Sequence, residues 1–226
     1  MRPLPERPLN FVRRLRFLLF PARCPCCGEA LLPRRLFCTT CEKKLYEDFT
    51  LRRFEIHMTK ESRVLTTAAV WDYEKLENTL NHYKFDGVVD ARDALGAAMA
   101  CLAEEKLAGG FDLVTSVPSR PGRAKALGFD HAGELAKRTA AVLGLPCRPL
   151  LRRRKDTKVQ HTLGREERLV NLKGAFLPLE EVQGKRILLV DDIVTTGTTL
   201  CECTRTLYEA GAARVEAVCA ASANKK

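Results

Sequence analysis

The stretch that decides the fold is residues 187–199, which read ILLVDDIVTTGTT. It begins with four branched apolar residues, a run typical of a strand buried on both faces of a parallel sheet. The run ends at two carboxylates, Asp191 and Asp192, and a turn made almost wholly of threonine and glycine follows. Residues 200–210 contain no proline or glycine and carry apolar side chains at helical spacing, namely Leu200, Cys203 and Leu207. We therefore predict a strand, an acidic pair, a hydroxyl-rich turn and a helix, in that order.

This order of elements suits a ribose that carries a phosphate group. The N–H groups of the turn and the positive end of the helix dipole can hold a phosphate dianion, and threonine hydroxyls add neutral donors. The two carboxylates can accept hydrogen bonds from the sugar hydroxyls, which makes Asp191 and Asp192 the candidate catalytic residues. The predicted phosphate-binding residues are Thr195, Thr196, Gly197, Thr198 and Thr199.

Two other interpretations of the stretch fit less well. Response-regulator receiver domains also place an acidic pair after a buried strand, but near the start of the domain and without a Thr/Gly turn. A plain connection between strand and helix needs neither the two acids nor the run of threonines. Residues 187–199 instead resemble the thirteen-residue signature of type I phosphoribosyltransferases. That resemblance implies binding of phosphoribosyl pyrophosphate (PRPP) together with Mg²⁺.

Length and charge narrow the class of protein. The 226 residues allow one sizeable α/β domain and a small appendage. A formal net charge of +10 favours anionic partners such as phosphates or nucleic acid, although a solvated basic surface would give the same balance.

Ten cysteines form one tight group near the N-terminus and five scattered positions in apolar or helical surroundings. This distribution indicates metal binding and buried thiols in a reducing compartment, so we expect a cytoplasmic location. No apolar run is long enough for a membrane span. We expect residues 1–22 to include a short amphipathic helix that packs on the next module; a membrane-surface role is the alternative.

The N-terminal group contains two Cys-x-x-Cys pairs within residues 24–41. Four soft thiolates in a tetrahedron select zinc, and a site filled by four protein ligands is structural. A redox Cys-x-x-Cys would not need a second copy so near. The sequence leaves open an alternative pairing through Cys26. The predicted zinc ligands are Cys24, Cys27, Cys38 and Cys41.

The middle of the chain is less informative. Residues 42–63 are charged and weakly patterned, so we interpret them as a linker. A strand over 64–73 and helices over 76–85 and 90–108 are expected next. His82 and Tyr83 can belong to a ligand pocket, but ordinary packing or surface positions are the more common case for such residues.

A second anion-binding loop is predicted after residue 117. The strand 112–117 ends in a segment rich in proline, glycine and cations, and a helix is expected over 130–143. Ligands of open α/β sheets bind where the carboxyl ends of neighbouring strands part, so this loop can face the same ligand as the first. We place the pyrophosphate near Ser119 and Arg120.

The resemblance sharpens here to the ComF competence family, which is similar to phosphoribosyltransferases and carries an N-terminal four-cysteine zinc module. Val117-Pro118 and Gly128-Phe129 match the family pattern, whereas Asp130 and His131 replace its Asn and Gln. We expect Asp130 to act as a helix N-cap instead.

A long polar insertion follows over residues 152–173. Its matches to the family pattern are Gln160, Leu163, Arg168 and Asn171, followed by the tetrapeptide Lys173-Gly174-Ala175-Phe176. By resemblance this is a mobile loop that closes over pyrophosphate, which its cations can neutralise. A single-stranded nucleic-acid contact and a solvated basic loop remain the alternatives.

The resemblance implies an α/β fold of the type I phosphoribosyltransferase kind, a parallel sheet with flanking helices, preceded by a zinc module. The expected domains are residues 1–48 and 63–222, with 63–110 as hood and edge strand and a last strand over 214–218. The implied role is DNA uptake in natural competence or related nucleotide metabolism, with single-stranded DNA and a DNA-translocating ATPase as partners. Both a PRPP-dependent transferase and a non-catalytic DNA-binding or docking factor fit. The sequence identifies neither the acceptor nor a general base.

Overall fold

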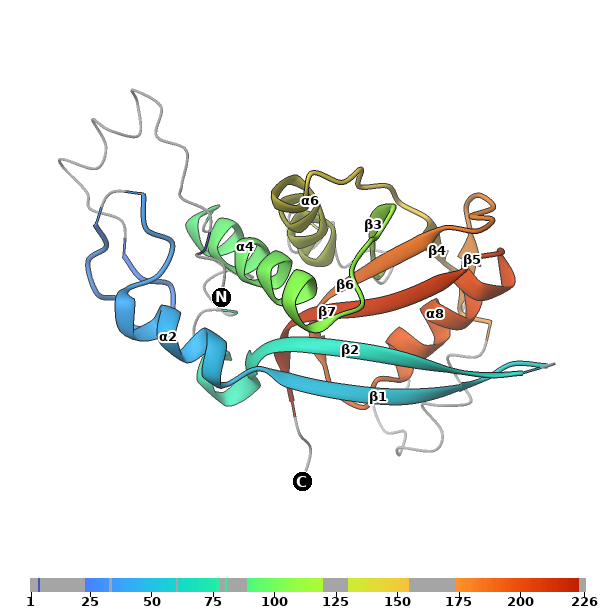
Figure 1. Ribbon diagram of the computed structural model, residues 1–226, viewed down its shortest axis with the longest axis horizontal. Helices are drawn as coiled ribbons and strands as arrows, with labels where there is room; N and C mark the ends of the chain where they lie inside the picture. The colour runs from blue at the N-terminus through green and yellow to red at the C-terminus, as the bar shows by residue number, and fades with distance from the viewer. Residues whose placement is uncertain are drawn as a thin grey trace.

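The computed structural model describes residues 4, 23–32, 34–59, 61–77, 80, 89–119, 130–154 and 174–223. Its centre is a five-stranded sheet (Figure 1) in the order β1 (Thr50–His57), β2 (Ser62–Asp72), β7 (Arg214–Ser222), β6 (Arg186–Val194) and β3 (Leu113–Ser116). The last four of these strands run parallel, and β1 pairs with β2 in the antiparallel sense. The predicted α/β fold is confirmed, with one antiparallel edge strand added to the parallel sheet.

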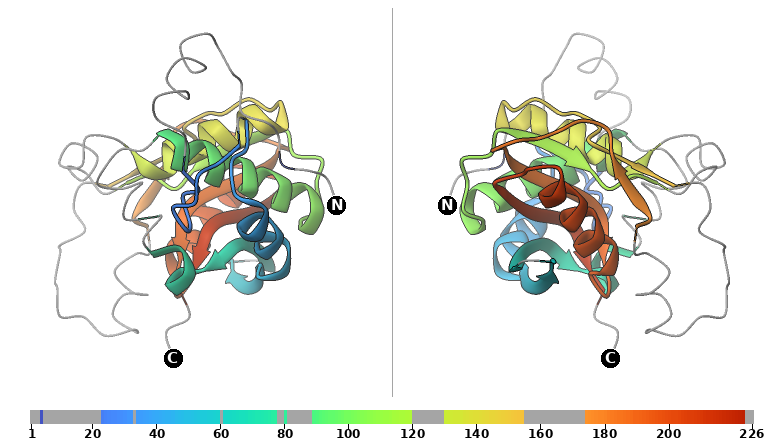
Figure 2. Two further views of the ribbon diagram at one scale, coloured as in Figure 1. Left: turned by 90° about the vertical axis from the view of Figure 1, so that its left-hand side faces the viewer. Right: turned by 90° about the vertical axis from the view of Figure 1, so that its right-hand side faces the viewer.

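Both faces of the sheet are covered (Figures 1 and 2). On one face lie α4 (Val89–Lys106) and α6 (His131–Leu143), and on the other lies α8 (Thr198–Glu209). A two-stranded ribbon of β4 (Leu151–Arg153) and β5 (Phe176–Pro178) packs beside α8. The predicted helices over 90–108, 130–143 and 200–210 thus correspond to α4, α6 and α8.

The apolar run in β6 is divided between the two faces. Leu188 and Val190 belong to the cluster under α4 and α6, whereas Ile187 and Leu189 belong to the cluster under α8. All four are fully buried. A central parallel strand needs apolar side chains on both of its faces, which is why the run is continuous and does not alternate with polar residues.

The predicted linker over residues 42–63 is wrong. Its first part completes α2 (Thr39–Glu47), and residues 50–57 form β1, which pairs with β2 along its whole length. Phe54 and Ile56 pack in the hydrophobic cluster under α8, while the alternating residues Arg53 and Glu55 are exposed. These exposed charges gave the segment the composition of a linker and hid the alternation of a strand.

The N-terminal cysteine module shares its core with the sheet. The Phe37 and Trp71 rings meet edge to face, with centroids 5.5 Å apart and an interplanar angle of 84°. Cys38 and Cys41 belong to the same hydrophobic cluster as Trp71 and Leu76. The domain bounds of 1–48 and 63–222 remain a prediction, but the two parts are joined by a common apolar core.

Some predicted elements lie partly or wholly outside the described residues. The N-terminal amphipathic helix falls there, as do His82 and Tyr83 of the expected helix over 76–85. The described start of that helix follows β2 directly, at residues 73–77. Within the described ranges, no helix has the length and apolarity that crossing a membrane requires.

The shared core predicts a large effect of Phe37→Ala. Phe37 is fully buried, and removing a buried phenyl ring costs about 3–5 kcal/mol of unfolding free energy. Urea unfolding followed by the fluorescence of Trp71, the single tryptophan of the chain, measures the loss. Leu32→Ala is the matched control, since the Leu32 side chain is 73% exposed and its removal should change stability by at most about 0.5 kcal/mol. Equal stabilities of the two variants would contradict a shared core.

Candidate functional site

The acidic pair lies at the carboxyl end of β6. Asp191 and Asp192 are both half-buried, and the Asp192 N–H donates to Asp191 Oδ1 at 2.9 Å. That bond holds the Asp191 carboxylate against the backbone N–H of the next residue. Because β3 and β6 are parallel neighbours, the segment that leaves β3 begins beside the acidic pair, where the Val117 N–H donates to Val190 O at 2.9 Å.

The turn at residues 195–197 leads directly into α8. Gly197 occupies the N-cap position with φ = 80°, a left-handed conformation that favours glycine. Thr196 Oγ1 and Thr198 Oγ1 share a hydrogen bond of 2.9 Å. Within the described part of the chain, no side chain caps this helix. The first-turn N–H groups have no acceptor inside a helix, so the turn presents the donors that a phosphate requires.

Strand β1 contributes two side chains that the sequence analysis did not find. Arg52 Nη1 donates to Thr195 O at 2.5 Å, and the ring of Phe54 lies against Gly197. The interpretation of residues 42–63 as a linker excluded both residues from the site. The available signal was the alternation of Arg52, Phe54 and Ile56 with exposed residues, a period of two.

Tyr73 is a further neighbour of the acidic pair. It directly follows β2, and its hydroxyl donates to Glu77 Oε1 at 3.4 Å. Burial raises the pKa of the Tyr73 phenol, and the carboxylates of Glu77 and Asp192 raise it further. A neutral, hydrogen-bonding aromatic ring therefore lies near Asp192 at the same edge of the sheet.

The second predicted loop is described only at its two ends. Ser119 Oγ donates to Asp130 Oδ1 at 2.7 Å, and Arg120 lies outside the described residues. Asp130 occupies the N-cap position of α6, but its side chain makes no capping hydrogen bond. The predicted N-cap position is therefore confirmed, but the carboxylate accepts the Ser119 hydroxyl, which joins the two ends of the loop, and does not cap the helix.

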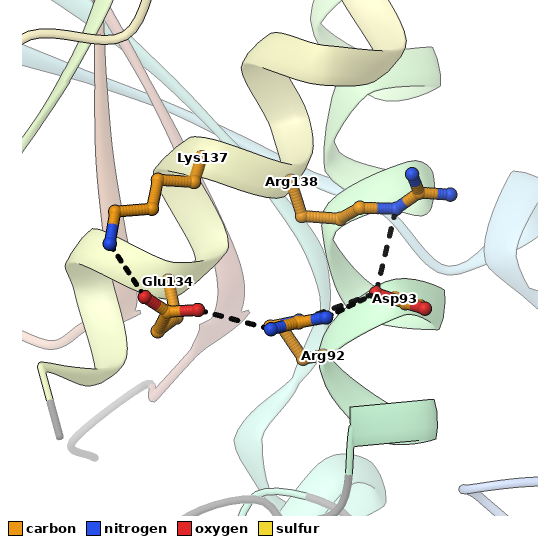
Figure 3. A network of polar contacts seen from close by, with 5 residues as sticks. All are labelled: Arg92, Asp93, Glu134, Lys137 and Arg138. Carbon is orange, nitrogen blue, oxygen red and sulfur yellow. Dashed lines mark hydrogen bonds and ion pairs between the residues drawn. The ribbon is translucent and has the colours of Figure 1, made fainter.

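A charged network fixes α6 against α4 (Figure 3). Glu134 accepts from Lys137 Nζ at 2.8 Å and from Arg92 Nη1 at 3.1 Å. Asp93, which is buried, pairs with Arg92 at 3.1 Å and with Arg138 at 3.8 Å. Lys137 and Arg92 lower the pKa of Glu134, so its carboxylate stays ionised. The network thus holds the start of α6 in place.

The four predicted zinc ligands come together in the N-terminal module. Their sulfur atoms all lie within 4.8 Å of one another, and Cys27 Sγ and Cys38 Sγ are 3.6 Å apart. Zn–S bonds of about 2.3 Å in a tetrahedron separate the sulfurs by about 3.8 Å, so the donor set fits zinc in type and in spacing. Cys26 is not a member of the cluster. The thiols brought together are those of Cys24, Cys27, Cys38 and Cys41.

The other five cysteines lie outside the N-terminal module. Cys101, Cys203 and Cys219 are buried and Cys201 is partly buried, as expected. Cys147 is exposed, which contradicts the prediction of a buried thiol. It makes an isolated parallel bridge with Val114 on the way to β4, outside the main sheet.

The long insertion leaves the fold from the β4–β5 ribbon. The Arg154 N–H donates to Ala175 O at 2.9 Å, and the Gly174 N–H donates to Glu202 Oε1 of α8 at 2.5 Å. These bonds hold both ends of the insertion beside α8. Residues 155–173, which include Gln160, Leu163, Arg168 and Asn171, lie outside the described residues, so the role of the insertion as a lid stays a prediction.

Comparisons with known proteins found one matching family model and several relatives. A family model described as phosphoribosyl transferase domain matches residues 130–226. DNA utilization protein YhgH of Salmonella typhi is 37% identical over 109 residues, 48% of each chain. Competence protein F of Haemophilus influenzae is 32% identical over 93 residues, 39% of this chain and 41% of that protein. The chain thus spans about half the length, or less, of these curated relatives.

Among solved structures, the glutamine PRPP amidotransferase from B. subtilis is 19% identical and has a TM-score of 0.41. The match covers 74% of this chain and 43% of that one. The family assignment comes from the sequence matches instead. A phosphoribosyl transferase domain and relatives named for competence and DNA utilization coincide in one sequence, and these matches support assignment of the chain to the ComF family.

Proposed function

We propose that this protein binds PRPP with Mg²⁺ at the carboxyl edge of the sheet. One observation carries the proposal: the acidic pair of β6 leads straight into a left-handed glycine turn and a helix N-terminus that no described side chain caps. The 5′-phosphate binds to residues 195–199, and the ribose hydroxyls bind to Asp191 and Asp192. The ligand thus matches the donors and the acceptors of the site.

The pyrophosphate group lies near Ser119, Arg120 and the insertion after β4. Mg²⁺ binds in proteins through one or two carboxylates together with substrate phosphates, and it neutralises charge on the pyrophosphate. In a transfer reaction the C1′–O bond to pyrophosphate breaks and a bond from C1′ to the acceptor forms. Negative charge then grows on the pyrophosphate, and fixed cations stabilise it. Asp191 and Asp192 hold the sugar as positive character develops on it.

The biological setting that we propose is cytoplasmic handling of DNA during natural competence, or related nucleotide metabolism. The names of the relatives, DNA utilization protein and competence protein, support this setting. Single-stranded DNA and a DNA-translocating ATPase are the proposed macromolecular partners. The zinc module packs on Trp71 and Leu76 on one side, and we propose that such a partner docks on this module.

Calorimetric titration with PRPP and Mg²⁺ tests the ligand site. We expect Asp191→Asn/Asp192→Asn to weaken PRPP binding at least about tenfold, because two ionised acceptors become neutral. Asp112→Asn is the matched control. Its carboxylate pairs with Arg186 at the opposite edge of the sheet, with a distance of 2.8 Å, and PRPP binding should not change. No heat with the unaltered protein, or equal affinities for the double variant and the parent, would refute the site.

The second candidate function is non-catalytic binding of single-stranded DNA, which the net charge of +10 favours. If about four phosphates are neutralised, affinity should fall about 50-fold between 50 and 200 mM salt. Fluorescence anisotropy of a labelled oligonucleotide measures the affinity, and a flat salt dependence would remove this function.

Pyrophosphate release from PRPP separates the two functions, since only a transferase releases pyrophosphate. The assay uses candidate acceptors and is run with and without the oligonucleotide.

We also propose one structural zinc ion per chain, held by the four clustered thiolates. Metal analysis of protein purified without added zinc should find one equivalent. Cys27→Ser should lose zinc to a competing chelator, because a hydroxyl is a poor substitute for a soft thiolate. Cys26→Ser, the neighbouring position outside the cluster, should retain it. Well under one equivalent in the parent, or equal losses from both variants, would contradict the assignment.

A further inference from the structure

The edge strand β1 reaches the turn that precedes α8. Its pairing with β2 places Arg52 opposite Thr67 and Phe54 opposite Leu65. Phe54 packs on the hydrophobic cluster that α8 covers, and α8 contacts β1 directly. Arg53, between the two, is exposed. Alternation along the strand thus directs Arg52 and Phe54 to the side of α8, and Arg53 away from it.

Phe54 closes the outer side of the turn. A Cβ atom added to Gly197 would lie 2.3 Å from Cε1 of the Phe54 ring, closer than real contacts allow. Gly197 is therefore required twice, once for its φ of 80° and once for the approach of the ring. The ring fills the space that a side chain at this position would occupy, and the turn is held between β1 and α8.

Arg52 brings a positive charge to the same turn. Its guanidinium donates to Thr195 O at 2.5 Å and lies 4.9 Å from the centroid of the Phe54 ring. A cation beside the positive end of a helix dipole is unfavourable unless an anion binds there as well. The guanidinium has five N–H donors, and the bond to Thr195 O uses one of them.

We propose that Arg52 is a positioning residue for the phosphate end of a ribose 5-phosphate group. It holds the backbone of residues 195–197 through the Thr195 carbonyl, and it adds a positive charge beside the bound phosphate. Phe54 supports both the guanidinium and Gly197. This inference rests on the proposed PRPP site and deepens it, since it adds the edge strand β1 to the elements that hold the ligand.

The test compares Arg52→Ala with Arg53→Ala, two neighbouring arginines on opposite sides of one strand. The probes are PRPP, ribose 5-phosphate and inorganic pyrophosphate, each titrated with Mg²⁺ by calorimetry. We expect Arg52→Ala to weaken PRPP and ribose 5-phosphate about tenfold or more and to leave pyrophosphate unchanged. Arg53→Ala should bind all three ligands like the parent. Arg52→Lys should recover part of the lost affinity, because it restores the charge without the planar fork.

The outcomes separate this inference from the proposed function. If the parent binds PRPP and Arg52→Ala binds it as tightly as Arg53→Ala does, the role of Arg52 is refuted while the PRPP site stands. Equal weakening of pyrophosphate would also refute it, since the effect would not be confined to the 5′-phosphate. If the parent binds no PRPP, the proposed function fails first. Thermal unfolding checks that each variant folds. If Arg52→Ala does not fold, the comparison of Arg52→Lys with Arg53→Lys replaces the first pair.

Discussion

The burial of β6 between two layers is the constraint on which the rest of the structure depends. Its apolar residues Ile187 to Val190 divide between the α4/α6 side and the α8 side, so this strand can occupy only the interior of the sheet. The polar residues that follow must then emerge at the carboxyl edge. Because α8 packs on the same sheet, its N-terminus is held next to the acidic pair, and this packing creates the candidate site.

The N-terminal module and β1 complete this edge and do not form separate units. Trp71 packs on Phe37 and pairs with Ala221 of β7. Ala221 in turn pairs with Ile193 of β6, the residue just after the acidic pair. The module therefore lies at the same edge of the sheet as the candidate site. A change in the core of the module would reach Trp71 and the adjacent Tyr73, whose phenol has its pKa raised in part by the Asp192 carboxylate.

The charges at this edge match those of the proposed phosphorylated-sugar ligand. The turn at residues 195–197 and the start of α8 present N–H groups, and Arg52 adds a formal positive charge beside them. Asp191 and Asp192 present acceptors a few residues away. The donors thus lie at one end of a short segment and the acceptors at the other. A ligand with a phosphate at one end and vicinal hydroxyls at the other requires this arrangement. The Ser119–Asp130 hydrogen bond joins the two described ends of the second loop.

Local patterns in the sequence were enough to predict the strand, turn and helix of residues 187–199, the helices α4 and α6, and the four cysteines that cluster. Each depends on spacing within a few residues or on a short loop. Tertiary structure decided the rest. β1 pairs with β2 although charges dominate its exposed side; Asp130 accepts from Ser119, eleven residues earlier, in place of capping α6; and Arg52 meets Thr195, 143 residues away. Such partners are brought together only by the packing of the sheet, which no local periodicity encodes.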